Sequence, residues 1–270
     1  MADYQTLEVL VADHVGHVVL NRPEKANAMN QAFWQECRQA FVQLDADPAA
    51  RVVVLSARGR HFSAGIDLGM LATIGGDKHE EPARRIERLR RLILALQETF
   101  SVIERCRKPV LAAVQGGCIG GGVDMVSACD MRYCTEDAQF VIKEIDIGLT
   151  ADVGTLQRLP HLIGDGMVRE LAYTGRPLGG AEARAIGLVN GVFPDAEALH
   201  AGVLEVARQI AAKSPLAVRG TKEMILYARD HSVSDALNYV ATWNAGMISE
   251  ADLREAMAAQ QEQRPPRFDD

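Results

Sequence analysis

The sequence lacks the features that mark nucleic-acid-binding, membrane or secreted proteins. Its 29 Lys and Arg are outnumbered by 36 Asp and Glu, and the formal net charge of −7 argues against a nucleic acid or an anionic membrane as partner. No apolar run reaches the roughly 18–20 residues that span a bilayer. The N-terminus has no basic stretch leading into an apolar one, and the C-terminus has no peroxisomal signal, so we expect a cytoplasmic protein.

Cysteine and histidine are few and scattered. The five cysteines are an odd number with no C-x-x-C pair, which favours free thiols over a disulfide framework. Among the seven histidines only His14 and His17 are close in sequence, and neither H-E-x-x-H nor paired cysteines occur. We therefore expect no metal site.

Three common catalytic motifs are missing as well. No G-x-S-x-G occurs, which argues against a serine hydrolase of the usual kind. The glycine cluster at 116–122 is not followed by Gly-Lys-Ser/Thr and does not fit G-x-G-x-x-G in register. It is therefore not a P-loop, and it indicates a dinucleotide site only weakly.

Apolar sequence is abundant, at 48% of the 270 residues, which is enough for a large core. Alternation over 7–20 predicts a hairpin, and the continuous apolar runs at 52–55 and 110–114 are typical of strands buried on both faces. Apolar residues repeat at intervals of three and four between Ile86 and Ile103 and predict a long helix. This alternation of strands and helices predicts an α/β fold.

The pattern along the chain also predicts its organisation. Asn30 and Ser249 are expected to cap the helices that follow them. Residues 69–82 contain two adjacent glycines and a proline and predict a mobile loop. Because the pattern is almost wholly helical after about residue 195, we divide the chain into an α/β core at 1–195 and a helical region at 196–270. That region packs on its own core or on a neighbouring subunit.

The glycine cluster at 116–122 allows two interpretations. It lies between a predicted buried strand and a short helix. In the first interpretation the glycines only make a tight turn that lets the strand and the helix pack closely. In the second, backbone N–H groups at the start of the helix form a cradle for an anion or a developing oxyanion.

Carboxylates follow the glycine cluster in the chain. Asp124, Glu144, Asp146 and Asp152 lie among apolar neighbours. They could be ordinary caps or surface charges, and Asp152 could cap a helix that begins at Val153. Carboxyl groups in an apolar setting have raised pKa values, however, and suit proton transfer. An oxyanion cradle combined with such groups is what chemistry through an enolate needs.

Three segments carry a resemblance to a known family. They are His61-Phe62-Ser63-Ala64-Gly65-Ile66-Asp67-Leu68, Gly120-Gly121-Gly122-Val123-Asp124 and Gln157-Arg158-Leu159-Pro160. In order and spacing they resemble the crotonase, or enoyl-CoA hydratase/isomerase, superfamily, and the likeness covers nearly the whole chain.

The resemblance implies a ββα-spiral core with a helical C-terminal region that serves oligomerisation, as a homotrimer or homohexamer. It also implies an acyl-CoA thioester substrate and no cofactor, since CoA is part of that substrate. By motif, the backbone N–H groups of Ala64 and Gly121 form the oxyanion hole. The substrate-binding residues implied are Ala64, Gly65, Ile66, Asp67, Leu68 and Gly121.

Two further segments are implied to lie near the substrate. The loop at 25–28 would border the CoA nucleotide, and the loop at 69–82 would shape the acyl pocket. Five arginines of the long predicted helix either approach the CoA phosphates or form a solvated face. They are arginines 84, 85, 88, 90 and 91.

Within the superfamily, the acids and bases decide the reaction. A hydratase typically has two glutamates, at the positions of Asp124 and Glu144, and a glycine where this chain has Asp152. The set here is similar to the branch that moves a proton from C2 to C6 of a 3,5-dienoyl-CoA, giving the 2,4-dienoyl-CoA in unsaturated fatty-acid β-oxidation. The resemblance assigns Glu144 as base, Asp152 as acid and Asp124 as a neighbour that tunes Glu144. The alternatives are a hydratase or other acyl-CoA enzyme of the superfamily, and a non-catalytic acyl-CoA binder.

Overall fold

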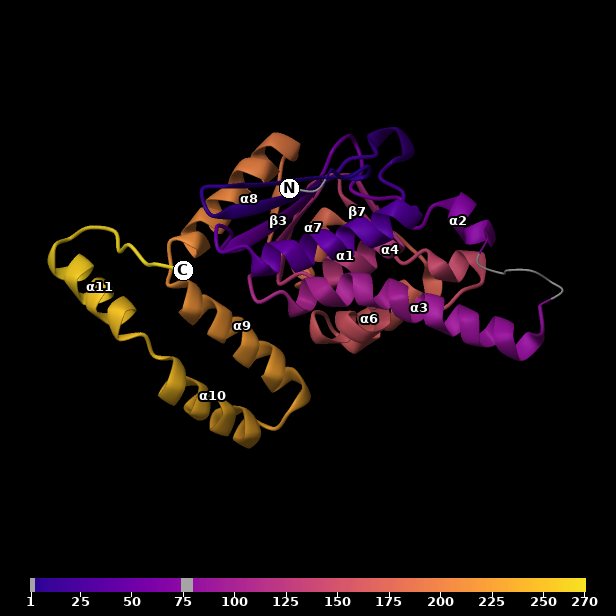
Figure 1. The fold of residues 1–270 in the computed structure, drawn as a ribbon. Coiled ribbons are helices and arrows are strands. Elements are labelled where there is room, and N and C mark those ends of the chain that lie inside the picture. Colours follow the sequence, from indigo (N-terminus) through magenta and orange to yellow (C-terminus); the bar gives the residue numbers. More distant parts are fainter. Residues whose placement is uncertain (1–2, 74–79) are drawn as a thin grey trace.

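A six-stranded sheet forms the centre of the computed structural model, which describes residues 3–73 and 80–270 (Figure 1). The strand order is β1-β2-β3-β4-β6-β9, with β1 and β2 antiparallel and every other neighbouring pair parallel. A second sheet has the order β5-β7-β8. The strands are β1 (Leu7–Ala12), β2 (Val15–Leu20), β3 (Val52–Ala57), β4 (Val110–Val114), β5 (Gly117–Ile119), β6 (Met131–Thr135), β7 (Gln139–Val141), β8 (Leu178–Gly179) and β9 (Gly191–Phe193).

Helices cover both faces of the large sheet. On one face, Val53 and Leu55 of β3 belong to the same buried cluster as Phe41 of α1 (Gln31–Ala46) and Phe100 of α3 (Pro82–Arg105). On the other face, the intervening strand residues pack with Val203 of α8 (Ala196–Ala211). Alternate side chains of one strand thus enter two cores, which explains the continuous apolar runs in the sequence.

Short helices connect the strands and carry the loops around the site. The 3-10 helices are η1 (Pro23–Lys25), η2 (Glu144–Ile147) and η3 (Leu159–His161). The short α-helices are α2 (Leu68–Thr73), α4 (Gly121–Ser127), α5 (Thr155–Arg158), α6 (Asp165–Thr174) and α7 (Gly180–Ala185).

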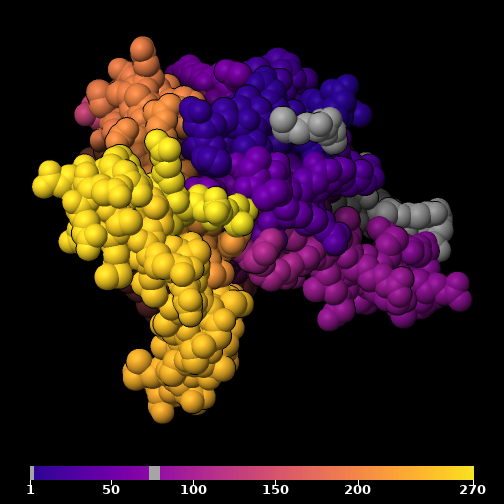
Figure 2. All heavy atoms as spheres, turned by 60° about the vertical axis from the view of Figure 1, so that its left-hand side comes forward, coloured from indigo at the N-terminus to yellow at the C-terminus, as the bar shows by residue number. Residues whose placement is uncertain are grey.

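The last three helices extend away from the sheet. They are α9 (Pro215–Asp230), α10 (Val233–Met247) and α11 (Glu250–Gln261). Figure 1 shows them as an arm beside the core, and Figure 2 shows this arm projecting from the rest of the surface. The chain then returns to the core, where Arg51 Nη2 donates to the Phe268 carbonyl oxygen at 2.6 Å.

Most of the predicted elements are confirmed. The hairpin, the strands around 52–55 and 110–114, the long helix and the helical C-terminal region are all present, so the α/β class is correct. The Asn30 and Ser249 side chains accept the backbone N–H groups of Phe33 and Asp252, as capping requires. The division at residue 195 stays a prediction, although α8 packs on the sheet.

One local prediction is wrong, and one of the open alternatives is excluded. The expected loop at 69–82 is partly helical, because Leu68–Thr73 form α2 and Pro82 begins α3; residues 74–79 lie outside the described residues. Asp152 does not cap a helix, since α5 begins at Thr155 with Gly154 as its N-cap. Within the described residues, no helix is long and apolar enough to cross a membrane.

Candidate active site

A cavity of about 490 Å³ lies beside the turn into α4. Its apolar wall comes from α1, α2, α3 and η2, and its polar groups come mainly from the segment 143–153. The apolar lining includes Trp34, Leu68, Leu71, Leu89, Leu92, Ile93, Leu96 and Ile147. Such a lining suits an alkyl or alkenyl chain, with a few polar groups gathered at one end.

The glycine cluster forms the turn between β5 and α4. Gly120 has φ +50° and ψ −117°, a conformation that favours glycine. A Cβ added there would lie 2.9 Å from Glu144 Oε1, so a side chain would displace that carboxylate. Gly121 is the first residue of α4, and its N–H has no acceptor in the described part of the chain. The cradle interpretation therefore fits the observed geometry.

A second free N–H lies next to that of Gly121. Ile66 is held opposite Met29 in a parallel bridge, in which the Met29 N–H donates to Gly65 and the Met29 carbonyl accepts from Asp67. The Ile66 N–H itself has no acceptor among residues 3–73 and 80–270. A Cβ at Gly65 would lie only 3.3 Å from the Gly121 nitrogen, which shows how closely the two segments approach.

The structure corrects two of the residues predicted from the motif. The Ala64 N–H donates to the Ala26 carbonyl at 2.8 Å, so it is not free for a substrate oxygen.

Asp67 does not line the cavity, whereas Ala64, Gly65, Ile66 and Leu68 do. The Asp67 carboxylate instead accepts the Gly69 N–H at the start of α2 and lies 3.4 Å from Arg22 Nη1. Its place in the motif is therefore structural.

The three predicted carboxylates differ in their access to the cavity. Glu144, at the start of η2, is half-buried and lines it. Burial, and in addition the charge of Asp152, raise the pKa of Glu144. Asp152 lines the same cavity but is exposed as a residue, and partial burial raises its pKa as well. Gln97 Nε2 of α3 donates to the backbone carbonyl of Asp152 at 2.7 Å and so holds the segment around Asp152 against α3.

Asp124 is fully buried on α4 and does not line the cavity. Its Oδ1 accepts the N–H of Thr155, the first residue of α5, at 2.6 Å, while Oδ2 is buried with no hydrogen-bond partner. Burial, with a further contribution from the charge of Glu144, raises the pKa of Asp124 to about 7. Asp124 therefore contacts α5 and interacts electrostatically with Glu144, without reaching the cavity itself.

This pKa predicts how Asp124 affects stability. Because the folded-state pKa is above the unfolded value, the native state binds the proton more tightly, and stability falls as the pH rises from about 4 to about 7. Asp124→Asn keeps an acceptor for Thr155 and cannot ionise. We expect it to be more stable than the parent by about 1–3 kcal/mol above pH 7, with little difference near pH 4. Urea unfolding at both pH values measures this, and equal gains at both pH values would contradict it.

Other predicted contacts do not belong to this cavity. Residues 25–28 are absent from its lining, and most of the arginines between 84 and 91 are exposed on α3. Their roles toward CoA stay predictions. No group of three or more His, Cys, Asp or Glu among the described residues is placed to hold a metal ion.

Known proteins resemble this chain over nearly its whole length. A family model described as enoyl-CoA hydratase/isomerase matches residues 11–270. The human protein "Delta(3,5)-Delta(2,4)-dienoyl-CoA isomerase, mitochondrial" is 52% identical over 97% of this chain and 80% of its own length. The Arabidopsis thaliana protein "Delta(3,5)-Delta(2,4)-dienoyl-CoA isomerase, peroxisomal" is 46% identical over 99% of this chain and 98% of its own. A crystal structure of an enoyl-CoA hydratase from Bacillus anthracis has a TM-score of 0.89 at 32% identity, covering 98% of this chain and 99% of that one.

These relatives also correct the expected location. The names of the human and Arabidopsis proteins place them in mitochondria and peroxisomes, so the prediction of a cytoplasmic protein is wrong. That prediction depended on the absence of signals at the two ends of the sequence, and such an absence does not identify a compartment.

Proposed function

The chain belongs to the enoyl-CoA hydratase/isomerase family, and on that premise we propose how its residues isomerise a 3,5-dienoyl-CoA to the 2,4-dienoyl-CoA. The activity is that of the Δ3,5-Δ2,4-dienoyl-CoA isomerases of fatty-acid oxidation, which are 46–52% identical to it in Arabidopsis thaliana and human. The observation that carries the mechanism is that Glu144 and Asp152 line one apolar cavity together with the free N–H groups of Ile66 and Gly121.

The two N–H groups would bind the thioester oxygen of the substrate. When the proton at C2 leaves, negative charge moves to this oxygen, and preorganised donors stabilise it. The positive end of the α4 dipole at Gly121 adds to the effect. The oxyanion hole is therefore assigned to Ile66 and Gly121, in place of Ala64 and Gly121.

The proton transfers are assigned to the two carboxyl groups that reach the cavity. Glu144 takes a proton from C2, and the electrons of that C–H bond form the C1–C2 double bond of a trienolate, which is conjugated from the thioester oxygen to C6. Asp152 then donates a proton to C6, and the double bonds shift to the 2,4-positions. Two carboxyl groups in unlike surroundings can serve as base and acid at one pH. Only protons and double bonds move, so we propose no cofactor besides the CoA of the substrate.

The assay that tests this function compares two thioesters. With a 3,5-dienoyl-CoA, the purified protein should produce the absorbance of a 2,4-dienoyl-CoA. With crotonyl-CoA, hydration should be much slower, because Asp152 stands where a hydratase typically has glycine. Robust hydration without isomerisation would replace this proposal by the hydratase alternative, and binding of both thioesters without turnover would favour the non-catalytic binder.

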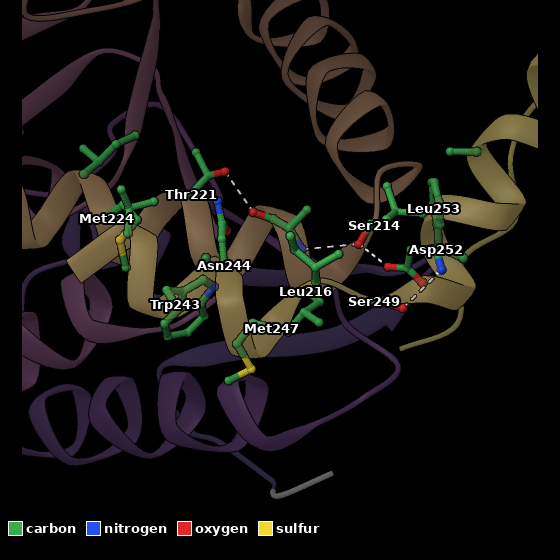
Figure 3. Close-up of a pocket in the computed structure, with 17 residues that line it drawn as sticks. Ser214, Leu216, Thr221, Met224, Trp243, Asn244, Met247, Ser249, Asp252 and Leu253 are labelled. Carbon is green, nitrogen blue, oxygen red and sulfur yellow. Dashed lines mark hydrogen bonds between the residues drawn. The ribbon is translucent and has the colours of Figure 1, made fainter. Parts of the chain in front are cut away.

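The helical arm is proposed to bind further copies of the chain. A groove of about 510 Å³ runs between α9, α10 and α11, lined by Leu216, Met224, Trp243, Met247 and Leu253 (Figure 3). The helix α10 buries none of its own residues, which a stable helix in water seldom does without a partner. Large apolar side chains continue over the arm, among them Val233, Leu237, Ile248 and Met257. An apolar surface of this extent is typical of an interface between subunits.

We expect the protein to form a homotrimer or homohexamer. Light scattering should give three or six times the chain mass of 29.4 kDa. Leu253→Asp places a charge at a groove residue that is 53% exposed in the single chain, and it should shift the mass toward one subunit. The matched control is Leu94→Asp, at an exposed leucine of α3 outside the arm. A monomeric parent, or equal effects of both variants, would contradict the assignment.

A further inference from the structure

Asp152 stands in the wall between two cavities. The apolar cavity of about 490 Å³ described above is called the acyl cavity here. Besides this cavity, Asp152 and Val153 line a second cavity of about 370 Å³ on the other side of the same segment. The second cavity is bounded by α3, α5, η3 and the end of α9. Its remaining lining is mostly polar and includes Gln97, Ser101, Glu104, Gln157, Arg158 and His161.

Paired charges line this second cavity. Glu104 Oε1 lies 2.5 Å from Arg229 Nη1 and 3.3 Å from Arg158 Nε. Burial alone would raise the pKa of Glu104, but hydrogen bonds from the two arginines bring it below its ordinary value, so the group stays ionised. The Arg158 guanidinium also packs on Gly154, where a Cβ would lie 1.8 Å from Nη1. A polar space of this size, lined by charged groups, holds water.

The proposed reaction leaves a proton imbalance inside the site. After one turnover Glu144 carries the proton taken from C2, while Asp152 has lost the proton given to C6. Either Glu144 passes its proton directly to Asp152, or each group exchanges with solvent on its own. The two carboxyl groups differ in their exposure to solvent. Glu144 is half-buried beside Gly120, whereas Asp152 is exposed and lines the polar cavity.

We propose that the polar cavity beside Asp152 is the route by which solvent protons reach this carboxyl group. A water-borne proton binds the Asp152 carboxylate from the polar side, and the O–H bond so formed breaks when the proton passes to C6 on the apolar side. Glu144 releases the C2 proton to solvent through the acyl cavity. The hydrogen gained at C6 therefore comes from water and is not the one lost at C2. This inference rests on the isomerase function proposed above.

Isotope tracing tests the origin of the C6 hydrogen. The substrate is a 3,5-dienoyl-CoA with deuterium at both C2 positions, turned over many times in ordinary water, with the product examined by mass spectrometry and NMR. We expect 2,4-dienoyl-CoA with ordinary hydrogen at the position newly formed at C6. Deuterium at C6 in most product molecules would show direct transfer and overturn the proposal. If no product forms, it is the isomerase function itself that fails.

A pair of variants tests the route. Gln157 is an exposed residue of α5 that lines the polar cavity, and its side chain has no hydrogen bond within the described residues, so both Gln157→Phe and Gln157→Ala should fold. Gln157→Phe narrows the cavity, while Gln157→Ala widens it. In the phenylalanine variant we expect steady-state kcat to fall by about fivefold or more, with the first turnover on excess enzyme unchanged, because only reprotonation is slowed. The alanine variant should match the parent in both. Equal steady-state rates for the two variants would overturn the assigned route.

Discussion

Replacing Glu144 by glutamine is expected to lower kcat for 3,5-dienoyl-CoA isomerisation by about 10²–10⁴-fold, because a neutral amide cannot take the C2 proton. Glutamine keeps the volume of the side chain that lies against Gly120, so the turn into α4 should be unchanged. Steady-state kinetics measure the loss, and circular dichroism checks the fold. Retention of more than a tenth of the parent activity would rule out Glu144 as the base.

The companion variant Asp152→Asn separates the two carboxyl groups by their order in the reaction. Without the acid at C6, product formation should fall by a similar factor, about 10²–10⁴-fold. Removal of the C2 proton does not need Asp152, so the variant should still exchange C2 hydrogens with deuterated water faster than it makes product. Glu144→Gln should lose both processes. The reverse pattern would exchange the assignments of acid and base.

Much of the fold could be predicted because its signals are local. The apolar runs of β3 and β4 reflect the burial of both faces of these strands. The side chain of Asn30 caps α1 by accepting an N–H only three residues away. Glu144 and Asp152 were also recognisable, since their apolar neighbours in the chain predicted burial, and burial raises the pKa of both carboxyl groups. In these cases the residue and its determining surroundings are close together in the chain.

The errors fall where the deciding partner is distant in the sequence. Whether Ala64 or Ile66 offers a free N–H depends on Ala26 and Met29, which take up the neighbouring backbone groups. The residues of the segment 61–68 do not by themselves show which backbone N–H remains without an acceptor. Asp124 was grouped with the other carboxylates for the same reason. Only its contact with Thr155, which lies 31 positions further along, shows that it is directed away from the cavity.

The oxyanion hole allows a test that removes a single backbone donor. Gly121 is the first residue of α4, a position that favours proline because its N–H makes no bond within the helix. Gly121→Pro deletes this N–H and places a ring carbon where the hydrogen pointed. We expect kcat/KM for the 3,5-dienoyl-CoA to fall by about 10²–10³-fold, the usual cost of losing an oxyanion-hole donor.

The matched control is Gly121→Ala, which adds a Cβ but keeps the N–H. That Cβ would lie 3.0 Å from Met29 Sδ, a flexible side chain that can shift by a few tenths of an ångström. The alanine variant should therefore retain most of the activity. Free CoA has no thioester oxygen, so its binding should be similar in both variants, and this separates loss of the donor from loss of the site. If alanine costs as much as proline, the space at Gly121 matters rather than its N–H, and the donor must lie elsewhere.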